Sequence, residues 1–165
     1  MRILPGWLVS TGERFRDRIA RPFARLGIDP NVLTLLSFLC GAASGAAFAF
    51  GRILAACILL AASGILDGLD GRVAGLSGRT SRFGAILDSS LDRYAEFALF
   101  GGLAWHFRES WIAGLAALAL VGSIMASYTR ARAEGLGVEC REGLAQRAER
   151  LGAVGTAAFI GFVFP

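Results

Sequence analysis

Long apolar runs alternate with short charged segments along this chain, and most of the apolar runs are too long for the core of an ordinary soluble domain. A helix rises about 1.5 Å per residue, so about 20 apolar residues cross a bilayer. The pattern predicts an all-α, polytopic membrane bundle of about five to six transmembrane helices over residues 30–165. The individual helices are expected at residues 31–50, 53–66, 84–106, 111–133 and 151–165. The last run is short for a full span, so we expect the chain to end inside a helix.

The first 29 residues have a different pattern, in which arginines alternate with apolar side chains. Trp7, Phe15 and Ile19 can share one helix face, while Arg14 and Arg18 point elsewhere. This pattern is typical of a basic amphipathic helix lying on a membrane surface, with a solvated arm as the alternative. We therefore expect residues 1–29 to form an interfacial segment.

Basic residues are unevenly placed, and all 17 of them are arginine, giving a net charge of +4. They gather in the N-terminal segment, in an expected loop over residues 71–83 and in residues 130–150, whereas the other turns carry only Arg52 and Arg108. Positively charged segments stay on the cytoplasmic side of a membrane. The expected location is the cell membrane, with the N-terminus on the cytoplasmic face and no nucleic-acid partner.

Four carboxylates stand out in this apolar chain: Asp67, Asp70, Asp88 and Asp92. A charged side chain at membrane depth costs about 2.5–3.5 kcal/mol on insertion scales, so such residues are functional candidates. The first two are spaced i, i+3 near the end of one expected helix, and the others i, i+4 near the start of the next, antiparallel one. All four should meet at one membrane level, where two divalent cations would balance their charge.

The donor atoms at this position are hard oxygens without His or Cys, which favours Mg²⁺, with Mn²⁺ as an alternative. The simpler interpretation is that the aspartates cap helix ends and pair with arginines nearby. That explains one aspartate alone more easily than all four together.

The sequence Asp67-x-x-Asp70-Gly71-x-x-Ala74, followed by Gly84-x-x-x-Asp88-x-x-x-Asp92, resembles the signature of the CDP-alcohol phosphatidyltransferases. Pro30-Asn31-x-Leu33-Thr34 resembles the entry to that family's first helix. The resemblance implies a membrane enzyme of phospholipid synthesis, with its active site on the cytoplasmic face. Such an enzyme moves the phosphatidyl group from CDP-diacylglycerol to an alcohol and releases CMP. It also implies a homodimer.

The resemblance assigns roles to individual residues. Asp67, Asp70 and Asp88 would ligate one Mg²⁺, and Asp67, Asp88 and Asp92 would surround a second. Asp92 would also be the catalytic base that deprotonates the acceptor hydroxyl. The CDP-lipid would contact Asn31, Thr34, Gly71, Ala74, Ser81, Arg82 and Gly84.

Two features depart from the family. The arginine that normally follows the motif alanine and holds the CDP-lipid is Gly75 here, so its role could pass to Arg72, Arg79 or Arg82. The family also usually has six spanning helices, and this chain has room for about five.

The acceptor is indicated by residues 127–134, Ser-Tyr-Thr-Arg-Ala-Arg-Ala-Glu, which resemble a stretch of the phosphatidylinositol-phosphate synthases. Arg130 and Arg132, with Arg147 further on, would then bind the phosphate of a phosphorylated alcohol, inositol 1-phosphate. Glycerol 3-phosphate is the main alternative acceptor and serine a weaker one. Ordinary anchoring of arginines on the cytoplasmic side is an alternative explanation for this stretch.

Other function classes fit less well. A divalent-cation carrier would need polar groups along its whole path, but the outer halves of the helices offer almost only Ala, Gly, Leu and Phe. A non-enzymatic membrane scaffold is a third possible function. Gly41 and Gly45 form a small-residue face that could join two copies or pack within one chain.

Overall fold

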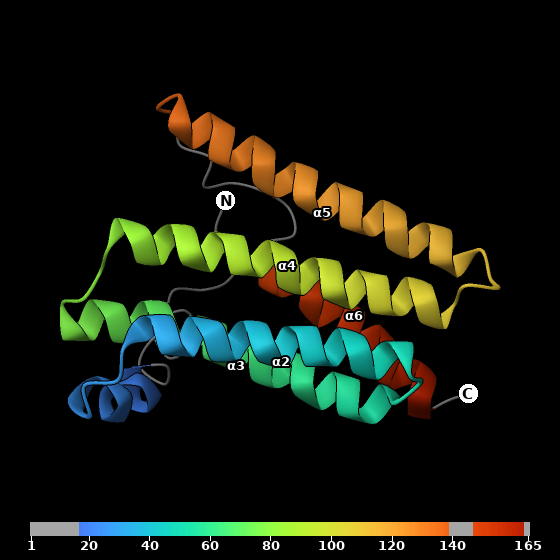
Figure 1. Ribbon diagram of the computed structural model, residues 1–165, viewed down its shortest axis with the longest axis horizontal. Helices are drawn as coiled ribbons and strands as arrows, with labels where there is room; N and C mark the ends of the chain where they lie inside the picture. Colours follow the sequence, from blue (N-terminus) through green and yellow to red (C-terminus); the bar gives the residue numbers. More distant parts are fainter. Residues whose placement is uncertain (1–16, 139–146, 164–165) are drawn as a thin grey trace, which may run out of the picture.

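The computed structural model describes residues 17–138 and 147–163, and every regular element in these ranges is a helix. A short helix covers residues 17–25. The longer ones are α2 (Pro30–Ala49), α3 (Ile53–Ser77), α4 (Arg82–His106), α5 (Ile112–Gly135) and α6 (Arg147–Val163). Consecutive long helices run in opposite directions (Figure 1). The predicted all-α membrane bundle is confirmed.

Local chemistry fixes where the helices near the acidic motif begin. Asp29 precedes α2 and its Oδ1 accepts a hydrogen bond from the Asn31 amide at 2.9 Å, while Pro30 occupies the first helical position. Ser81 caps α4 in the same way, with its Oγ accepting from the Gly84 amide at 2.9 Å. Both helices therefore start at defined residues on the same side of the bundle.

The second helix is longer than the sequence analysis predicted, and the expected loop over residues 71–83 was wrong. No proline interrupts residues 67–77, so α3 continues to Ser77 and ends where Gly78 adopts φ 66°, a left-handed conformation that suits glycine. The connection to α4 is only residues 78–81. Asp67 and Asp70 thus lie inside a helix, and Arg72 lies on that helix rather than in a loop.

Small residues bring α2 and α4 into backbone contact. A Cβ built at Gly102 would overlap the Gly45 carbonyl, and one built at Gly45 would overlap the backbone of Ala98. A Cβ at Gly41 would lie 3.0 Å from that of Ala95. The Gly41 and Gly45 face is therefore used within the chain, as small-residue faces in membrane helices often are, and it leaves no room for a second copy.

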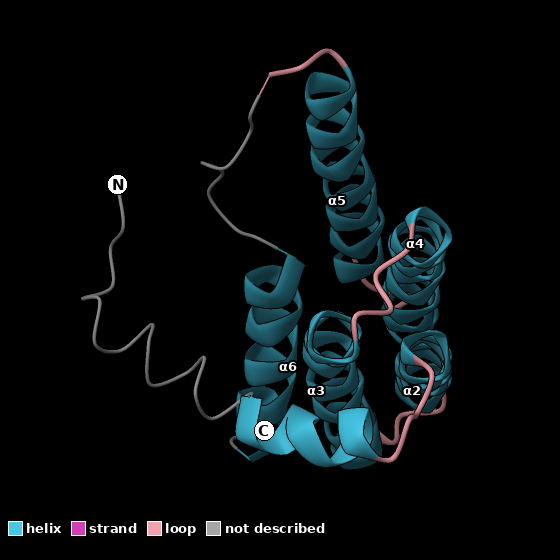
Figure 2. Cartoon of the chain, turned by 90° about the vertical axis from the view of Figure 1, so that its left-hand side faces the viewer, coloured by secondary structure: helices cyan, strands magenta, loops and turns pink. Residues whose placement is uncertain are grey.

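Helix α2 also packs against α3, and serine side chains join the two. Ser37 Oγ donates to the Ser63 carbonyl at 3.0 Å, and Ser44 Oγ donates to the Ala56 carbonyl at 2.8 Å. On the other side of the bundle, α5 packs against α4 and α6 packs against α3. Seen end-on, α2, α4 and α5 form one row and α3 and α6 lie beside it (Figure 2).

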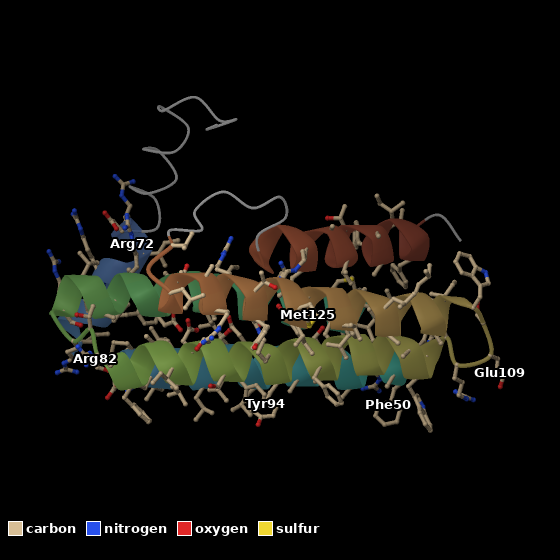
Figure 3. The ribbon with its side chains drawn as sticks, turned by 90° about the horizontal axis from the view of Figure 1, so that it is seen from above. Phe50, Arg72, Arg82, Tyr94, Glu109 and Met125 are labelled. Carbon is tan, nitrogen blue, oxygen red and sulfur yellow. The ribbon has the colours of Figure 1, made fainter. Side chains whose placement is uncertain are left out.

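The outer surface is apolar, as expected for a protein in lipid. In the described part of the chain, α2, α3 and α5 are each long and apolar enough to cross a membrane. Large exposed hydrophobic side chains include Leu39, Ile58, Phe97 and Leu118. The arginines Arg72 and Arg82 lie at one end of the bundle, and Phe50 and Glu109 lie toward the other (Figure 3). The helix over residues 17–25 lies across the end that carries the arginines (Figures 1 and 2).

Candidate active site

Three of the four predicted carboxylates converge between α3 and α4. One carboxylate oxygen from each of Asp67, Asp88 and Asp92 lies within 4.8 Å of the other two, and all three residues are partly buried. We call these residues the carboxylate triad. Three hard oxygen donors at this separation fit the ligand preferences of Mg²⁺ or Mn²⁺. The antiparallel arrangement of α3 and α4 creates the triad, because it sets the i, i+4 pair of α4 opposite Asp67.

The fourth carboxylate, Asp70, lies beside the triad and contacts α2. Its Oδ2 accepts a hydrogen bond from Thr34 Oγ1 at 2.6 Å, and only 6% of the residue is exposed. Asp70 is also close enough to Asp67 and Asp88 for their charges to interact. Thr34 therefore fixes one oxygen of Asp70, and this contact ties the beginning of α2 to the acidic site.

A cavity of about 250 Å³ adjoins the triad where α2 and α4 begin. Asp70 and Asp88 belong to its wall. Of the residues that the resemblance assigned to the CDP-lipid, all but Arg82 line it: Asn31, Thr34, Gly71, Ala74, Ser81 and Gly84. Arg79 and Thr80 from the short α3–α4 connection also line it, together with Pro30 and Ala85. The wall thus includes residues with hydroxyl, amide and carboxylate groups and one arginine.

The three arginines considered as substitutes for the missing motif arginine have different surroundings. Arg72 Nε lies 2.8 Å from Asp17 Oδ1 and so ties α3 to the helix over residues 17–25. Arg79 Nη1 donates to the Gly27 carbonyl at 2.9 Å and lines the cavity. Arg82 is the exposed first residue of α4. Arg79 is therefore the one of the three that faces the cavity.

A larger, mostly apolar cavity of about 980 Å³ lies between α3 and α6. Leu60 and Ile65 line it from α3, and Leu151 and Phe159 line it from α6. Asp67 also belongs to its wall. The triad therefore stands between a small polar cavity and a larger apolar one.

A second polar cluster lies next to the triad, formed by Arg93, Glu96, Ser123 and Arg150, which we call the Glu96 cluster. Ser123 Oγ on α5 donates to Glu96 Oε2 at 2.7 Å. Glu96 Oε1 lies 3.6 Å from Nη2 of Arg93 and 3.6 Å from Nη2 of Arg150 on α6. Arg93 Nη2 lies 3.6 Å from Asp92 Oδ2 as well. The cluster therefore joins three helices and reaches the triad.

The arginines predicted for the acceptor phosphate lie on α5 and α6. Arg130 and Arg132 lie in the last turns of α5, which diverges from α4 toward the end of the bundle where α4 begins (Figure 1). Arg147 is the first residue of α6, and its side chain lies outside the described ones.

Sequence reasoning left Arg93 and Glu96 out of the candidate site. The signal was present, because a charged pair inside an apolar helix is as costly as the aspartates. Their partners on α5 and α6 become visible only in the fold.

The comparisons with known proteins agree on one family. Residues 28–164 match the family model described as CDP-alcohol phosphatidyltransferase. The chain is 40% identical over 151 residues to the archaetidylinositol phosphate synthase of Methanothermobacter thermautotrophicus, covering 92% of this chain and 75% of that relative. It is 35% identical over 163 residues to the phosphatidylinositol phosphate synthase of Mycobacterium tuberculosis, covering 96% of this chain and 75% of that protein.

Solved structures agree with the sequence relatives. The fold superimposes on the crystal structure of the Mycobacterium tuberculosis phosphatidylinositol phosphate synthase with CDP-DAG bound, with a TM-score of 0.78 and 35% identity. The match covers 90% of this chain and 77% of that one. A structure of the same synthase in complex with manganese and citrate matches with a TM-score of 0.75 and 33% identity, over 88% of this chain and 72% of that one.

Proposed function

Because the chain belongs to the CDP-alcohol phosphatidyltransferase family, we propose that it transfers the phosphatidyl group of CDP-diacylglycerol to inositol 1-phosphate and releases CMP. The observation that carries this proposal is the position of Asp88, which belongs both to the polar cavity and to the carboxylate triad. A donor whose nucleotide fills the cavity brings its diphosphate to the triad. The names of the relatives support both the donor and the acceptor.

The donor is held at both ends in this proposal. Asn31, Thr34 and Ser81 offer polar groups to the nucleotide from the wall of the polar cavity. Arg79 supplies the positive charge for the diphosphate in place of the arginine that is Gly75 here. The acyl chains follow the apolar cavity between α3 and α6, which begins at Asp67.

The metal site takes two Mg²⁺ ions, with Mn²⁺ as a substitute, as the Mycobacterium tuberculosis structure in complex with manganese supports. Asp67, Asp88 and Asp92 hold one ion, and Asp70 joins Asp67 and Asp88 around the other. Divalent cations in such a site neutralise a diphosphate and stabilise the charge of the leaving group. Thr34 keeps Asp70 oriented for this role through its 2.6 Å hydrogen bond.

Asp92 is the catalytic base of the proposed reaction. Its carboxylate takes the proton from the acceptor hydroxyl, and the acceptor oxygen attacks the phosphorus that carries the diacylglycerol. A new phosphorus–oxygen bond forms as the bond to CMP breaks, and CMP leaves with the electron pair. Arg93 Nη2 lies 3.6 Å from Asp92 Oδ2, so a guanidinium group stands beside the proposed base.

The acceptor phosphate is assigned to Arg130, Arg132 and Arg147. The first two lie near the end of α5, which diverges from α4 in the direction of the end where α4 begins (Figure 1). Arginine suits this role because its planar fork binds phosphate through two hydrogen bonds.

The arrangement in the membrane follows from the charge pattern. We place the end of the bundle that carries Arg72 and Arg82 on the cytoplasmic face of the cell membrane. Residues 1–29 form the interfacial segment, and residues 30–165 form the transmembrane domain. The family resemblance favours a homodimer, with a contact outside the Gly41 and Gly45 face.

The direct test is CMP release by purified protein in detergent with CDP-diacylglycerol and Mg²⁺. Parallel samples receive inositol 1-phosphate, glycerol 3-phosphate or serine, and one set receives a chelator. Release with inositol 1-phosphate alone, lost with the chelator and in Asp92→Asn, supports the proposal. Release with glycerol 3-phosphate instead would change the acceptor, and no release from folded, metal-loaded protein would reject the activity.

A further inference from the structure

Glu96 is the most deeply buried charged residue of the described helices that contacts the site. The residue is 1% exposed and its side chain 0%. A carboxylate taken out of water is stable only with close partners, and removing its charge leaves those partners uncompensated. Because Glu96 sits at the centre of the Glu96 cluster, its charge determines where the two guanidinium groups lie.

The two arginines are less buried than the glutamate that holds them. The side chains of Arg93 and Arg150 are 29% and 23% exposed, so each contacts Glu96 while part of it remains accessible. They reach Glu96 from two helices, Arg93 from α4 itself and Arg150 from α6. One carboxylate therefore contacts both guanidinium groups, and that of Arg93 also lies beside the triad.

The location of these groups gives them a function. Arg93 Nη2 lies 3.6 Å from Asp92 Oδ2, so the cluster adjoins the residue that takes the proton from the acceptor. Arg93 is shared between Glu96 and Asp92, while Arg150 contacts Glu96 from α6, and guanidinium groups bind phosphate strongly. An acceptor bound there through its phosphate would have its hydroxyl groups close to Asp92.

We propose that Glu96 is a positioning residue for the acceptor: it holds Arg93 and Arg150 near Asp92, where they bind the phosphate of the phosphorylated alcohol in addition to the arginines assigned to it above. This inference rests on the proposed function for the identity of the acceptor. It differs from a purely structural role, in which Glu96 and Ser123 only tie α4 to α5.

The test compares Glu96→Gln with Ser123→Ala, using inositol 1-phosphate as the probe. Gln keeps the size of the side chain and an oxygen for Ser123 but removes the charge that holds the arginines. Ser123→Ala removes the link to α5 and keeps that charge. We expect Glu96→Gln to raise the Kd for inositol 1-phosphate, measured by calorimetry, about 10- to 100-fold, as losses of supporting contacts around a site do. Ser123→Ala should leave this Kd unchanged.

Turnover gives a second readout. The KM for inositol 1-phosphate should rise in Glu96→Gln, while the KM for CDP-diacylglycerol stays at the wild-type value. If Glu96→Gln does not fold, Glu96→Asp replaces it, because the shorter side chain keeps the charge but withdraws it from Arg150. A smaller rise in the same Kd is then expected.

Binding without turnover separates this inference from the proposed function. If wild-type protein releases no CMP but still binds inositol 1-phosphate in a Glu96-dependent way, the proposed reaction fails and the positioning role stands. The positioning role is overturned if the folded variants bind inositol 1-phosphate like the wild type. It is also overturned if Ser123→Ala weakens binding as much as Glu96→Gln, or if the wild type does not bind this probe.

Discussion

Helix α4 packs against α2 on one side and against α5 on the other, and the two contacts differ in kind. Toward α2 the backbones touch at Gly45 and Gly102, with no side chain between them. Toward α5 the contact includes the hydrogen bond from Ser123 to Glu96. The apolar stretch of α2 is 44% buried, whereas that of α5 is 6% buried.

The difference corresponds to the two substrates. The cavity proposed for the donor is built from the beginnings of α2 and α4 and the last part of α3, and α2 and α4 are held together by close backbone packing further along. Except for Arg93 on α4, the arginines proposed for the acceptor lie on α5 and α6, whose contacts with the rest of the bundle include the polar contacts of Glu96. If both assignments hold, the donor side is preformed, and the acceptor side depends on polar contacts that a single substitution can alter.

The largest effect should come from the triad, which both sides share. Asp92→Asn removes the proposed catalytic base and one proposed metal ligand with almost no change in the size of the side chain. CMP release should fall by about 100- to 10,000-fold, the usual contribution of general base catalysis. Thermal unfolding in detergent should be nearly unchanged, and an active Asp92→Asn protein would contradict the assigned role.

The second largest effect, a loss of stability, is expected at the backbone contact between α2 and α4. Gly102→Ala places a methyl group against the Gly45 carbonyl, where no flexible side chain can move aside. Overpacking of this kind costs about 1–3 kcal/mol, so the thermal midpoint should fall and donor binding should weaken.

Gly101→Ala is the matched control for that contact. A Cβ at Gly101 meets nothing within 4 Å, and alanine is the better helix former. Its thermal midpoint should therefore stay at or above that of the wild type. Equal losses in the two variants would show that the contact with Gly45 is not what stabilises this region.

A smaller effect is expected at the donor cavity. Arg79→Ala should raise the KM for CDP-diacylglycerol about 10- to 100-fold, because hydrogen bonds to a charged group contribute about 1.5–3 kcal/mol. Arg82→Ala, which changes an arginine outside the cavity wall, should have less effect. The double variant Gly75→Arg with Arg79→Ala sharpens the comparison. A Cβ at Gly75 meets nothing within 4 Å, so an arginine fits there and should restore donor binding. A larger loss from Arg82→Ala would contradict the assignment.

Local sequence features predicted much of this molecule. The apolar runs predicted the long helices, and the helices expected from residues 31 and 84 begin at Pro30 and Arg82. The spacing of the four aspartates placed them on facing sides of two antiparallel helices, and three of them form the triad. Periodicity within one helix is sufficient for such predictions, because it relates residues that are close in sequence.

Contacts between distant helices were harder to predict. Nothing in the sequence pairs Asp17 with Arg72, or Glu96 with Ser123 and Arg150, because these pairs depend on how helices are arranged around one another. The end of α3 was also misplaced, since the glycines and aspartates of residues 67–75 resemble a loop in composition. In the fold these residues belong to α3, which packs along α2. Helix α3 ends only where Gly78 adopts a left-handed backbone conformation.

Asp88 belongs both to the wall of the polar cavity and to the carboxylate triad. This shared position has a thermodynamic consequence. Two ligands that share a charged group cannot bind independently. Whatever factor a divalent cation adds to the affinity for the nucleotide lipid, the lipid must add to the affinity for the cation. The protein would then retain its metal most firmly while the donor is bound and release it most readily after CMP has left.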